Sequence, residues 1–212
     1  MSKFVRCEML FGDNFDKIKS LKILIIGVGG VGGHCLDALW RTGVSDITIV
    51  DFDTYDESNQ NRQIGSEALG ESKVSTLLQK YNGIKGYDVK VTQEWVANFD
   101  FEPFDFIVDA IDDVAPKCAL IAKCHKKLIS SMGSAKRIDP TKIEVTKLSK
   151  THNDPLAKKV REELKKIRWN KDVAVVFSSE TPITKSKGSF VGVTGAFGLV
   201  CASYIIRKAL EK

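Results

Sequence analysis

The sequence predicts an α/β protein: a Rossmann-like, doubly wound and mostly parallel sheet with extra C-terminal strands and a closing apolar helix. The first observation is the glycine-rich stretch 27–33, which follows the apolar run 21–26 and precedes a helical pattern. The second is the apolar run 47–50, which ends in Asp51. The third is the alternation of short apolar runs with helical patterns up to Gly133, which is typical of a parallel sheet covered by helices.

The individual elements follow from hydrophobic periodicity and turn residues. We expect residues 1–212 to form one domain, with an N-terminal helical segment (1–20), a nucleotide-binding core (21–133), and a basic substrate-side segment with the C-terminal helix (134–212). The expected elements are strands at 22–26, 46–51, 88–92, 104–110, 128–131, 142–148 and 173–178, helices at 32–42, 70–81, 116–126, 154–167 and 190–206, and loops at 53–66 and 181–189.

Composition narrows the class of protein. A chain of 212 residues with 43% hydrophobic content can bury one substantial core, and its net charge of +5 is mildly basic. The five cysteines include no CxxC pair, which argues against a disulfide framework and a four-cysteine zinc site. The N-terminus is charged and does not resemble a signal peptide, so we expect a cytoplasmic protein. The uncharged run 190–206 contains glycines and is shorter than a usual span, so no stable membrane insertion is expected.

The glycine stretch has the spacing of a phosphate-binding turn. Gly27 and Gly29 allow the backbone to turn sharply and to approach a phosphate, and Gly32 lets the following helix lie close to the strand. The start of that helix offers unpaired N–H groups and a partial positive charge to an anion. The alternative is a tight strand-to-helix turn without a ligand.

Polar side chains follow the predicted strands, at the edge where open α/β sheets bind ligands. Asp51 is suited to bind a ribose hydroxyl, and Arg62 and Lys73 offer positive charge to a polyphosphate. Asp112 is suited to hold Mg²⁺ together with phosphate oxygens. Lys73 alone has the alternative of a solvated charge, and Asp112 alone that of a cap for the helix near Pro116. Their placement at one sheet edge favours ATP as the ligand.

These motifs resemble the adenylating superfamily, which includes ubiquitin-activating enzymes and the activators of molybdopterin and thiamine sulfur carriers. The matching pieces are residues 27–32, 51–53, 59–63, Lys73 and 109–112. The resemblance implies that a carboxylate attacks the α-phosphate of ATP, giving an acyl-adenylate and pyrophosphate.

The resemblance also implies roles for single residues. It implies phosphate cradling at Gly29, ribose binding by Asp51, phosphate contacts from Asn59, Arg62 and Lys73, and Mg²⁺ support from Asp112. Arg6 matches an arginine that reaches the ATP of a partner subunit, which implies a homodimer. The predicted catalytic residues are Arg6, Arg62, Lys73 and Asp112, with Asp112 as the metal ligand. The predicted ATP-binding residues are Gly27, Gly29, Gly30, Asp51, Asp53, Asn59, Arg62, Lys73, Asp109 and Asp112.

Within the superfamily the chain is similar to the branch of dehydratases that act on threonylcarbamoyladenosine in tRNA. The distinctive pieces are residues 6–12, 61–64, 108–112, 131–134, 138–141, 149–151 and 154–157. The resemblance implies ATP-dependent cyclisation of threonylcarbamoyladenosine next to the anticodon, through adenylation of its carboxylate. It also implies a monovalent cation and a link to a cysteine desulfurase system, although the chain is shorter after Phe177 than typical members.

The C-terminal part carries the excess of positive charge. The basic segment, residues 142–187, holds 12 Lys or Arg against 6 Asp or Glu. Such a face suits the phosphates of tRNA, and its alternative is an ordinary solvated surface. The sequence is also compatible with two other functions. One is adenylation of the C-terminal carboxylate of a ubiquitin-like sulfur-carrier protein, and the other is a nucleotide-sensing or NAD-binding module without adenylation chemistry.

Overall fold

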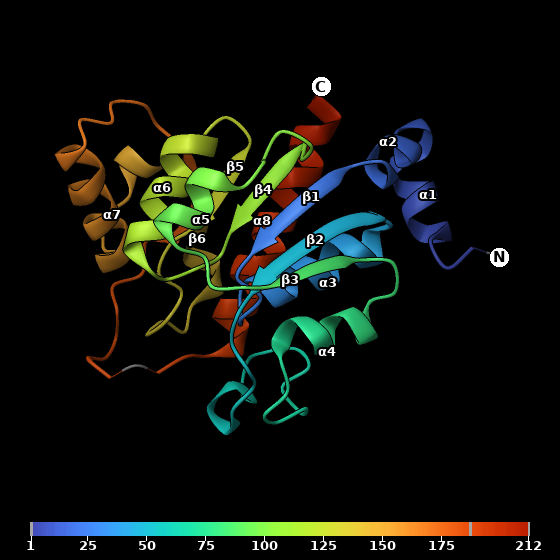
Figure 1. The fold of residues 1–212 in the computed structure, drawn as a ribbon, viewed down its shortest axis with the longest axis horizontal. Helices are drawn as coiled ribbons and strands as arrows, with labels where there is room; N and C mark the ends of the chain where they lie inside the picture. The colour runs from blue at the N-terminus through green and yellow to red at the C-terminus, as the bar shows by residue number, and fades with distance from the viewer. Residues whose placement is uncertain (1, 187, 212) are drawn as a thin grey trace.

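The computed structural model describes residues 2–186 and 188–211, so the predictions that fall on Met1, Lys187 and Lys212 lie outside the described residues. The chain forms a seven-stranded sheet with helices on both faces, which confirms the predicted fold class (Figure 1). The strand order is β3-β2-β1-β4-β5-β7-β6. Every neighbouring pair is parallel except β6 with β7, which is antiparallel.

The strands bring their carboxyl ends to one edge of the sheet. Ile26 at the end of β1 lies opposite Val50 of β2 and Asp109 of β4. Residues that follow these strands therefore begin side by side. The strands are β1 (Lys22–Ile26), β2 (Asp46–Asp51), β3 (Lys85–Asp88), β4 (Phe106–Asp109), β5 (Leu128–Ser131), β6 (Ile143–Lys147) and β7 (Ala174–Ser178).

Alternating strand residues supply two hydrophobic cores, one on each face of the sheet. Ile23 and Ile25 contribute to the core beneath α3, α4 and α8, whereas Leu24 and Ile26 contribute to the core beneath α5, α6 and α7. The helices are α1 (Val5–Phe11), α2 (Phe15–Lys19), α3 (Gly32–Thr42), α4 (Lys73–Lys80), α5 (Gln93–Asn98), α6 (Val114–Cys124), α7 (Pro155–Lys166) and α8 (Val191–Glu211), with short 3₁₀ turns at Gly12–Asn14, Glu57–Asn59, Pro140–Lys142 and Leu148–Lys150.

The last helix, α8, packs closely against α3, the helix that follows the glycine turn. A Cβ at Gly198 would overlap the carbonyl oxygen of Val31 and lie 2.8 Å from the amide nitrogen of Cys35. By length and composition α8 is apolar enough to cross a membrane, but 56% of its most apolar stretch is buried inside the protein. It therefore closes the core as expected, and it continues to Glu211, beyond the predicted end at residue 206.

Several predicted elements differ from the structure, including α4, which begins at Lys73 and not at residue 70, and α6, which begins at Val114 and not at Pro116. The third strand in the chain was expected at 88–92 but occupies Lys85–Asp88, and Val89 and Val91 follow in a loop. Their alternation placed the predicted strand too far along the chain, whereas β3 pairs through its backbone with residues 48–51 of β2. The N-terminal helical segment breaks at Gly12, whose φ of +52° falls outside the helical range. The short helix α5 was not predicted.

Side-chain caps fix the starts of four of the described α-helices. Ser72 caps α4, Thr92 caps α5, Asp113 caps α6 and Asp154 caps α7. Each accepts a hydrogen bond from a backbone amide in the first turn, which satisfies a donor that the helix itself leaves free. The cap of α6 is thus Asp113 and not Asp112. The alternative role of Asp112 as a helix cap is therefore excluded.

Candidate active site

A cavity of about 850 Å³ opens at the carboxyl edge of the sheet. One side consists of the glycine turn, the end of β2 and the loop 53–63. The other side, which we call the 131–135 wall, follows β5 and meets Leu156 of α7. Ten of the eleven predicted site residues were expected at this edge, and the cavity is lined by nine of them: Gly27, Gly29, Gly30, Asp51, Asp53, Asn59, Arg62, Lys73 and Asp112.

The glycine turn contains two kinds of glycine. Gly27 has a φ of +86°, and a Cβ at Gly32 would overlap the carbonyl oxygen of Gly27, so the turn itself requires both glycines. A Cβ at Gly29 would meet only the Gln63 side chain, at an ordinary 3.7 Å. The fold therefore does not demand a glycine at position 29. A ligand that approaches the backbone there would explain it.

The Asp51 carboxylate joins the end of β2 to the glycine turn. Its Oδ2 accepts a 2.7 Å hydrogen bond from the amide of Val28, and its Oδ1 accepts bonds from the amides of Phe52 and Asp53 at 2.8 and 3.0 Å. Asp51 is 8% exposed and lines the cavity. It therefore orders the turn in the structure, and its contact with a ribose hydroxyl stays a prediction.

Two cationic side chains face the cavity from the loop and from the start of α4. The Lys73 ammonium is buried and pairs at 2.9 Å with Asp53, whose side chain is 49% exposed. Arg62 donates through Nη1 to the carbonyl of Ser58 and to Oδ1 of Asn61, at 2.6 and 2.9 Å. Both positive charges are thus held in place by protein groups, as a preorganised anion clamp requires.

Several side chains of the loop 56–63 form hydrogen bonds with the loop's own backbone. Asp56 and Asn59 form a reciprocal capping box around the 3₁₀ turn, and Asn59 is 6% exposed. The carboxamide oxygen of Gln63 is buried without a hydrogen-bond partner among the described residues, and Gln63 lines the cavity next to Gly29. An unpartnered buried acceptor is costly, so a ligand hydroxyl or amine that donates to it would fit. Gln63 is a site residue that the sequence prediction left out.

The structure separates the two acidic residues predicted after β4. Asp112 is exposed and lines the cavity, where it can hold a cation between itself and a phosphate. Asp109 does not line the cavity: it is fully buried, with its carboxylate 2.8 Å from Nζ of Lys117 and 2.6 Å from Oγ of Ser130. This placement contradicts the prediction of direct ATP contact by Asp109, because the side chain turns into the core.

Arg6 also lies apart from the cavity of its own chain. It is exposed on α1, and it is not among the residues that line the cavity. In Figure 1 α1 lies beyond the amino-terminal end of β1, which is the opposite end of the sheet. Any contact of Arg6 with ATP would therefore have to occur in another subunit.

The cavity offers few protein ligands for a metal. Within residues 2–186 and 188–211 there is no group of three or more His, Cys, Asp or Glu side chains that could hold a metal ion. This donor set suits Mg²⁺, which is commonly held by one or two carboxylates together with substrate phosphates and water. Asp112, which is exposed and lines the cavity, fits that description.

A mostly parallel sheet with a glycine turn, a strand-end carboxylate and two cationic side chains around one cavity is typical of nucleotide-binding α/β proteins. The chain belongs to the ThiF family, whose model matches residues 4–212. It is 36% identical over 195 residues to tRNA threonylcarbamoyladenosine dehydratase of Bacillus subtilis, which covers 86% of this chain and 77% of the relative.

Solved structures agree with this assignment. The crystal structure of Escherichia coli tRNA N6-threonylcarbamoyladenosine dehydratase in complex with AMP is 34% identical, covers 99% of this chain and 94% of that chain, and superposes with a TM-score of 0.94. The complex of the same enzyme with ATP is 33% identical over the same shares and gives a TM-score of 0.93. These comparisons confirm the family resemblance seen in the sequence.

Proposed function

We propose that this protein uses ATP to cyclise threonylcarbamoyladenosine next to the tRNA anticodon, by adenylating its carboxylate. The observation that carries the proposal is the position of the cavity: one side holds the glycine turn with Arg62 and Lys73, and the other side leads through the 131–135 wall to the basic segment. ATP and a carboxylate attached to a large polyanion can therefore meet in one place. The relatives named for this reaction cover nearly the whole chain.

In the proposed reaction a carboxylate oxygen bonds to the α-phosphorus of ATP and pyrophosphate leaves. Ring closure onto the activated carbonyl then releases AMP, so that one water is removed overall. Arg62 and Lys73 stabilise the charge of the departing pyrophosphate, while Asp112 would hold Mg²⁺ against the phosphates. Because the attacking group belongs to the same substrate, proximity supplies much of the rate and no protein nucleophile is required.

The basic segment supports tRNA as the partner. On α7, Lys159 and Lys165 are exposed and have no ion pair among the described residues, whereas Lys158 and Lys166 pair with Glu162 and Glu163 at 4.0 and 2.6 Å. The first two lysines therefore offer their charge to phosphates. Beyond the end of α7, a second cavity of about 270 Å³ is lined by Lys165, Arg168 and Lys171 together with Trp169. Since α7 begins beside the first cavity, the basic surface leads away from the reaction centre, as an extended RNA requires.

A homodimer would complete the site. The exposed Arg6 shares α1 with Met9 and Leu10, which are 74% and 76% exposed. Apolar side chains this exposed suit a subunit contact that would carry Arg6 to the partner's cavity. Mixing Arg6→Ala with Arg62→Ala subunits tests this: two inactive variants should together recover about a quarter of wild-type activity, because random pairing makes half of the dimers mixed, with one intact site each. No recovery on mixing would refute a shared site.

The remaining expectations are part of the same proposal. Residues 1–212 act as one adenylating domain in the cytoplasm, with Mg²⁺ and a monovalent cation as cofactors. Chelation by EDTA should abolish turnover, and replacing K⁺ and Na⁺ with choline measures the need for the monovalent ion. A link to a cysteine desulfurase system is tested by co-purification and has no support in the described contacts.

ATP–pyrophosphate exchange distinguishes the proposal from its alternatives. Exchange that depends on tRNA carrying threonylcarbamoyladenosine supports it, together with appearance of the cyclic nucleoside by mass spectrometry. Exchange that depends on a small protein ending in Gly-Gly would instead indicate a sulfur-carrier adenylating enzyme, and ATP binding without exchange would indicate a nucleotide sensor. Arg62→Ala should lower exchange by about a hundredfold or more. The control is Arg41→Ala, which removes an exposed arginine paired with Asp37 on α3.

A further inference from the structure

Arg137 is the most thoroughly bonded buried cation on the substrate side of the cavity. It lies on the connection between β5 and β6 and is 2% exposed. Its guanidinium donates to four backbone carbonyls and pairs with one carboxylate. The partners are the carbonyls of Gly133, Ala135 (3.3 Å), Asn153 (3.1 Å) and Glu180 (3.1 Å), and Oδ2 of Asp154 at 3.6 Å.

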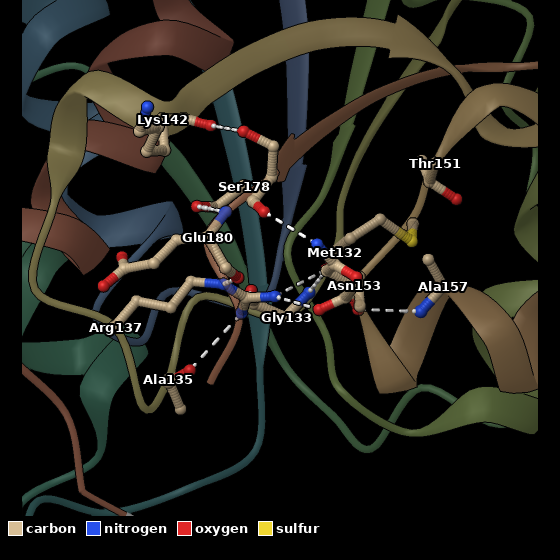
Figure 2. A network of polar contacts seen from close by, with 12 residues as sticks. Met132, Gly133, Ala135, Arg137, Lys142, Thr151, Asn153, Ala157, Ser178 and Glu180 are labelled. Atoms are coloured by element: carbon tan, nitrogen blue, oxygen red, sulfur yellow. Dashed lines mark hydrogen bonds and ion pairs between the residues drawn. The ribbon is translucent and has the colours of Figure 1, made fainter. Parts of the chain in front are cut away.

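These partners belong to three segments that are distant in sequence. Gly133 and Ala135 form part of the 131–135 wall, Asn153 and Asp154 begin α7, and Glu180 follows β7. In Figure 2 the Arg137 side chain runs inward, with its guanidinium lying between Gly133 and Asn153. One side chain thus joins the cavity wall to two separate points of the basic segment, one just before α7 and one just after β7.

The same junction is reinforced by two carboxylates. Asp154 accepts hydrogen bonds from the amides of Gly133 and Ala157, at 3.0 and 2.9 Å, so it ties the wall to the first turn of α7. The Glu180 carboxylate accepts from the amides of Ile138 and Asp139, at 3.2 and 3.0 Å. The residue before Arg137, Lys136, has a φ of +68°, a conformation that a non-glycine residue adopts only when its surroundings hold it there.

A buried guanidinium is poor evidence for a purely stabilising role. Moving a charge from water into the interior is costly, and well-packed apolar groups often stabilise a core as well or better. A guanidinium is planar and carries several N–H donors in a fixed arrangement, so it can hold several acceptors in one geometry. Here those acceptors are main-chain atoms of the wall that a bound substrate would meet.

We propose that Arg137 is a positioning residue for the reaction: its guanidinium fixes the 131–135 wall to the start of α7, so that the threonylcarbamoyl carboxylate reaches ATP in the correct orientation. This inference rests on the proposed function for its kinetic readout. We expect no effect of Arg137 on ATP binding, since none of its hydrogen bonds or ion pairs among the described residues involves the glycine turn, Arg62 or Lys73. Small displacements of a positioning group are enough to slow a reaction strongly.

The test compares Arg137→Ala with a matched control, Lys123→Ala. Lys123 also donates to three backbone carbonyls, those of Val96, Ala97 and Phe99, but it lies on α6 and lines neither cavity. For Arg137→Ala we expect kcat for cyclisation to fall by about tenfold to a hundredfold while KM for ATP changes less than about twofold. Arg137→Lys keeps the positive charge but loses the planar guanidinium, so its kcat should lie between those of the wild type and Arg137→Ala. Lys123→Ala should retain wild-type kcat.

Two further readouts separate positioning from a loss of folding. Added guanidinium ion, below denaturing concentration, should restore part of the kcat of Arg137→Ala and leave Lys123→Ala unchanged. Hydrogen exchange at residues 133–135 should accelerate in Arg137→Ala and slow again with guanidinium, and this holds even if the protein acts on a different substrate. If Arg137→Ala does not fold, Arg137→Lys is judged by the same measurements.

The proposal is overturned by any of three results. One is a kcat per folded molecule equal to that of the wild type, and another is an equal loss in both variants. The third is wild-type exchange at 133–135 in Arg137→Ala. A wild-type protein that shows no tRNA-dependent activity refutes the proposed function instead, while the exchange measurement still decides whether Arg137 holds the wall.

Discussion

Apart from Lys73, which lines the cavity, two buried cations support it from behind, Lys117 on the nucleotide side and Arg137 on the substrate side, and they are bound in different ways. Lys117 is fully buried and pairs with Asp109 at 2.8 Å, and it also donates to Oγ of Ser130 and the carbonyl of Ser131. Its partners lie at the ends of β4 and β5. Arg137 bonds mainly to carbonyls of loops. The nucleotide side thus takes its geometry from regular strands, whereas the substrate side depends on contacts between irregular segments.

The largest expected effect comes from breaking the pair on the nucleotide side. Lys117→Met leaves the Asp109 carboxylate buried without its partner, which should lower the free energy of unfolding by about 3–5 kcal/mol. The measurement is urea denaturation followed by circular dichroism. Lys117→Met combined with Asp109→Leu removes both charges and should recover most of that loss. A double variant as unstable as the single one would show that the pair is not the relevant unit.

The next prediction compares two glycines of the same turn. Gly32→Ala places a Cβ against the carbonyl oxygen of Gly27 and should cost about 1–3 kcal/mol of unfolding free energy. Gly29→Ala has room in the protein, so its stability should stay within about 0.5 kcal/mol of the wild type. Its ATP affinity should instead weaken by about tenfold, or 1.4 kcal/mol, as measured by calorimetry. Unchanged ATP affinity in Gly29→Ala would separate this glycine from the phosphate.

A smaller effect is expected on the substrate side. Replacing Lys165, Arg168 and Lys171 with alanine should leave stability nearly unchanged and weaken tRNA binding. The slope of log affinity against log salt should fall by up to about one unit for each charge that contacts a phosphate. Lys85→Ala, which alters an exposed pair with Asp46 at the far edge of the sheet, is the control. An unchanged slope in the triple variant would place the RNA elsewhere.

The smallest effect concerns cysteine chemistry. Burial raises the pKa of Cys118 and Cys124 to about 11 and that of Cys201 to about 12. Below these values the thiols stay protonated, so at pH 8 iodoacetamide should modify the partly exposed Cys7 first. Raising the pH toward 11 increases thiolate at the buried positions. Rapid modification of Cys118 at pH 8, detected by peptide mass spectrometry, would contradict this.

The sequence located the nucleotide side well because its signals are local. Gly27, Gly29, Asp51 and Lys73 follow strands or begin helices whose patterns are clear, and all of them line the cavity. Asp109 could not be assigned correctly, since a carboxylate at a strand end can turn to the cavity or to the core. Its direction is decided by Lys117, eight residues further on, whose burial the sequence does not reveal.

The contacts on the substrate side were harder to predict, because they too join residues that are distant in sequence. The partners of Arg137 are backbone carbonyls up to 43 residues away, and a carbonyl carries no residue-specific signal. The bounds of β3 were predicted wrongly because Val89 and Val91 alternate like a strand, although the pairing with β2 ends at Asp88. Local patterns therefore predict the helices and strands, whereas they do not predict hydrogen bonds between loops that are distant in sequence.

The contact between α8 and the start of α3 also affects the order of events during synthesis. The helix that carries the anion-binding end of the glycine turn is covered by residues 191–206, and Gly198 allows the backbones to touch at Val31. A nascent chain that has exposed only β1, α3 and β2 outside the ribosome has the turn sequence but not its support. The turn can reach its final packing only after α8 has emerged, so the nucleotide site is completed well after the residues of the glycine turn have been made.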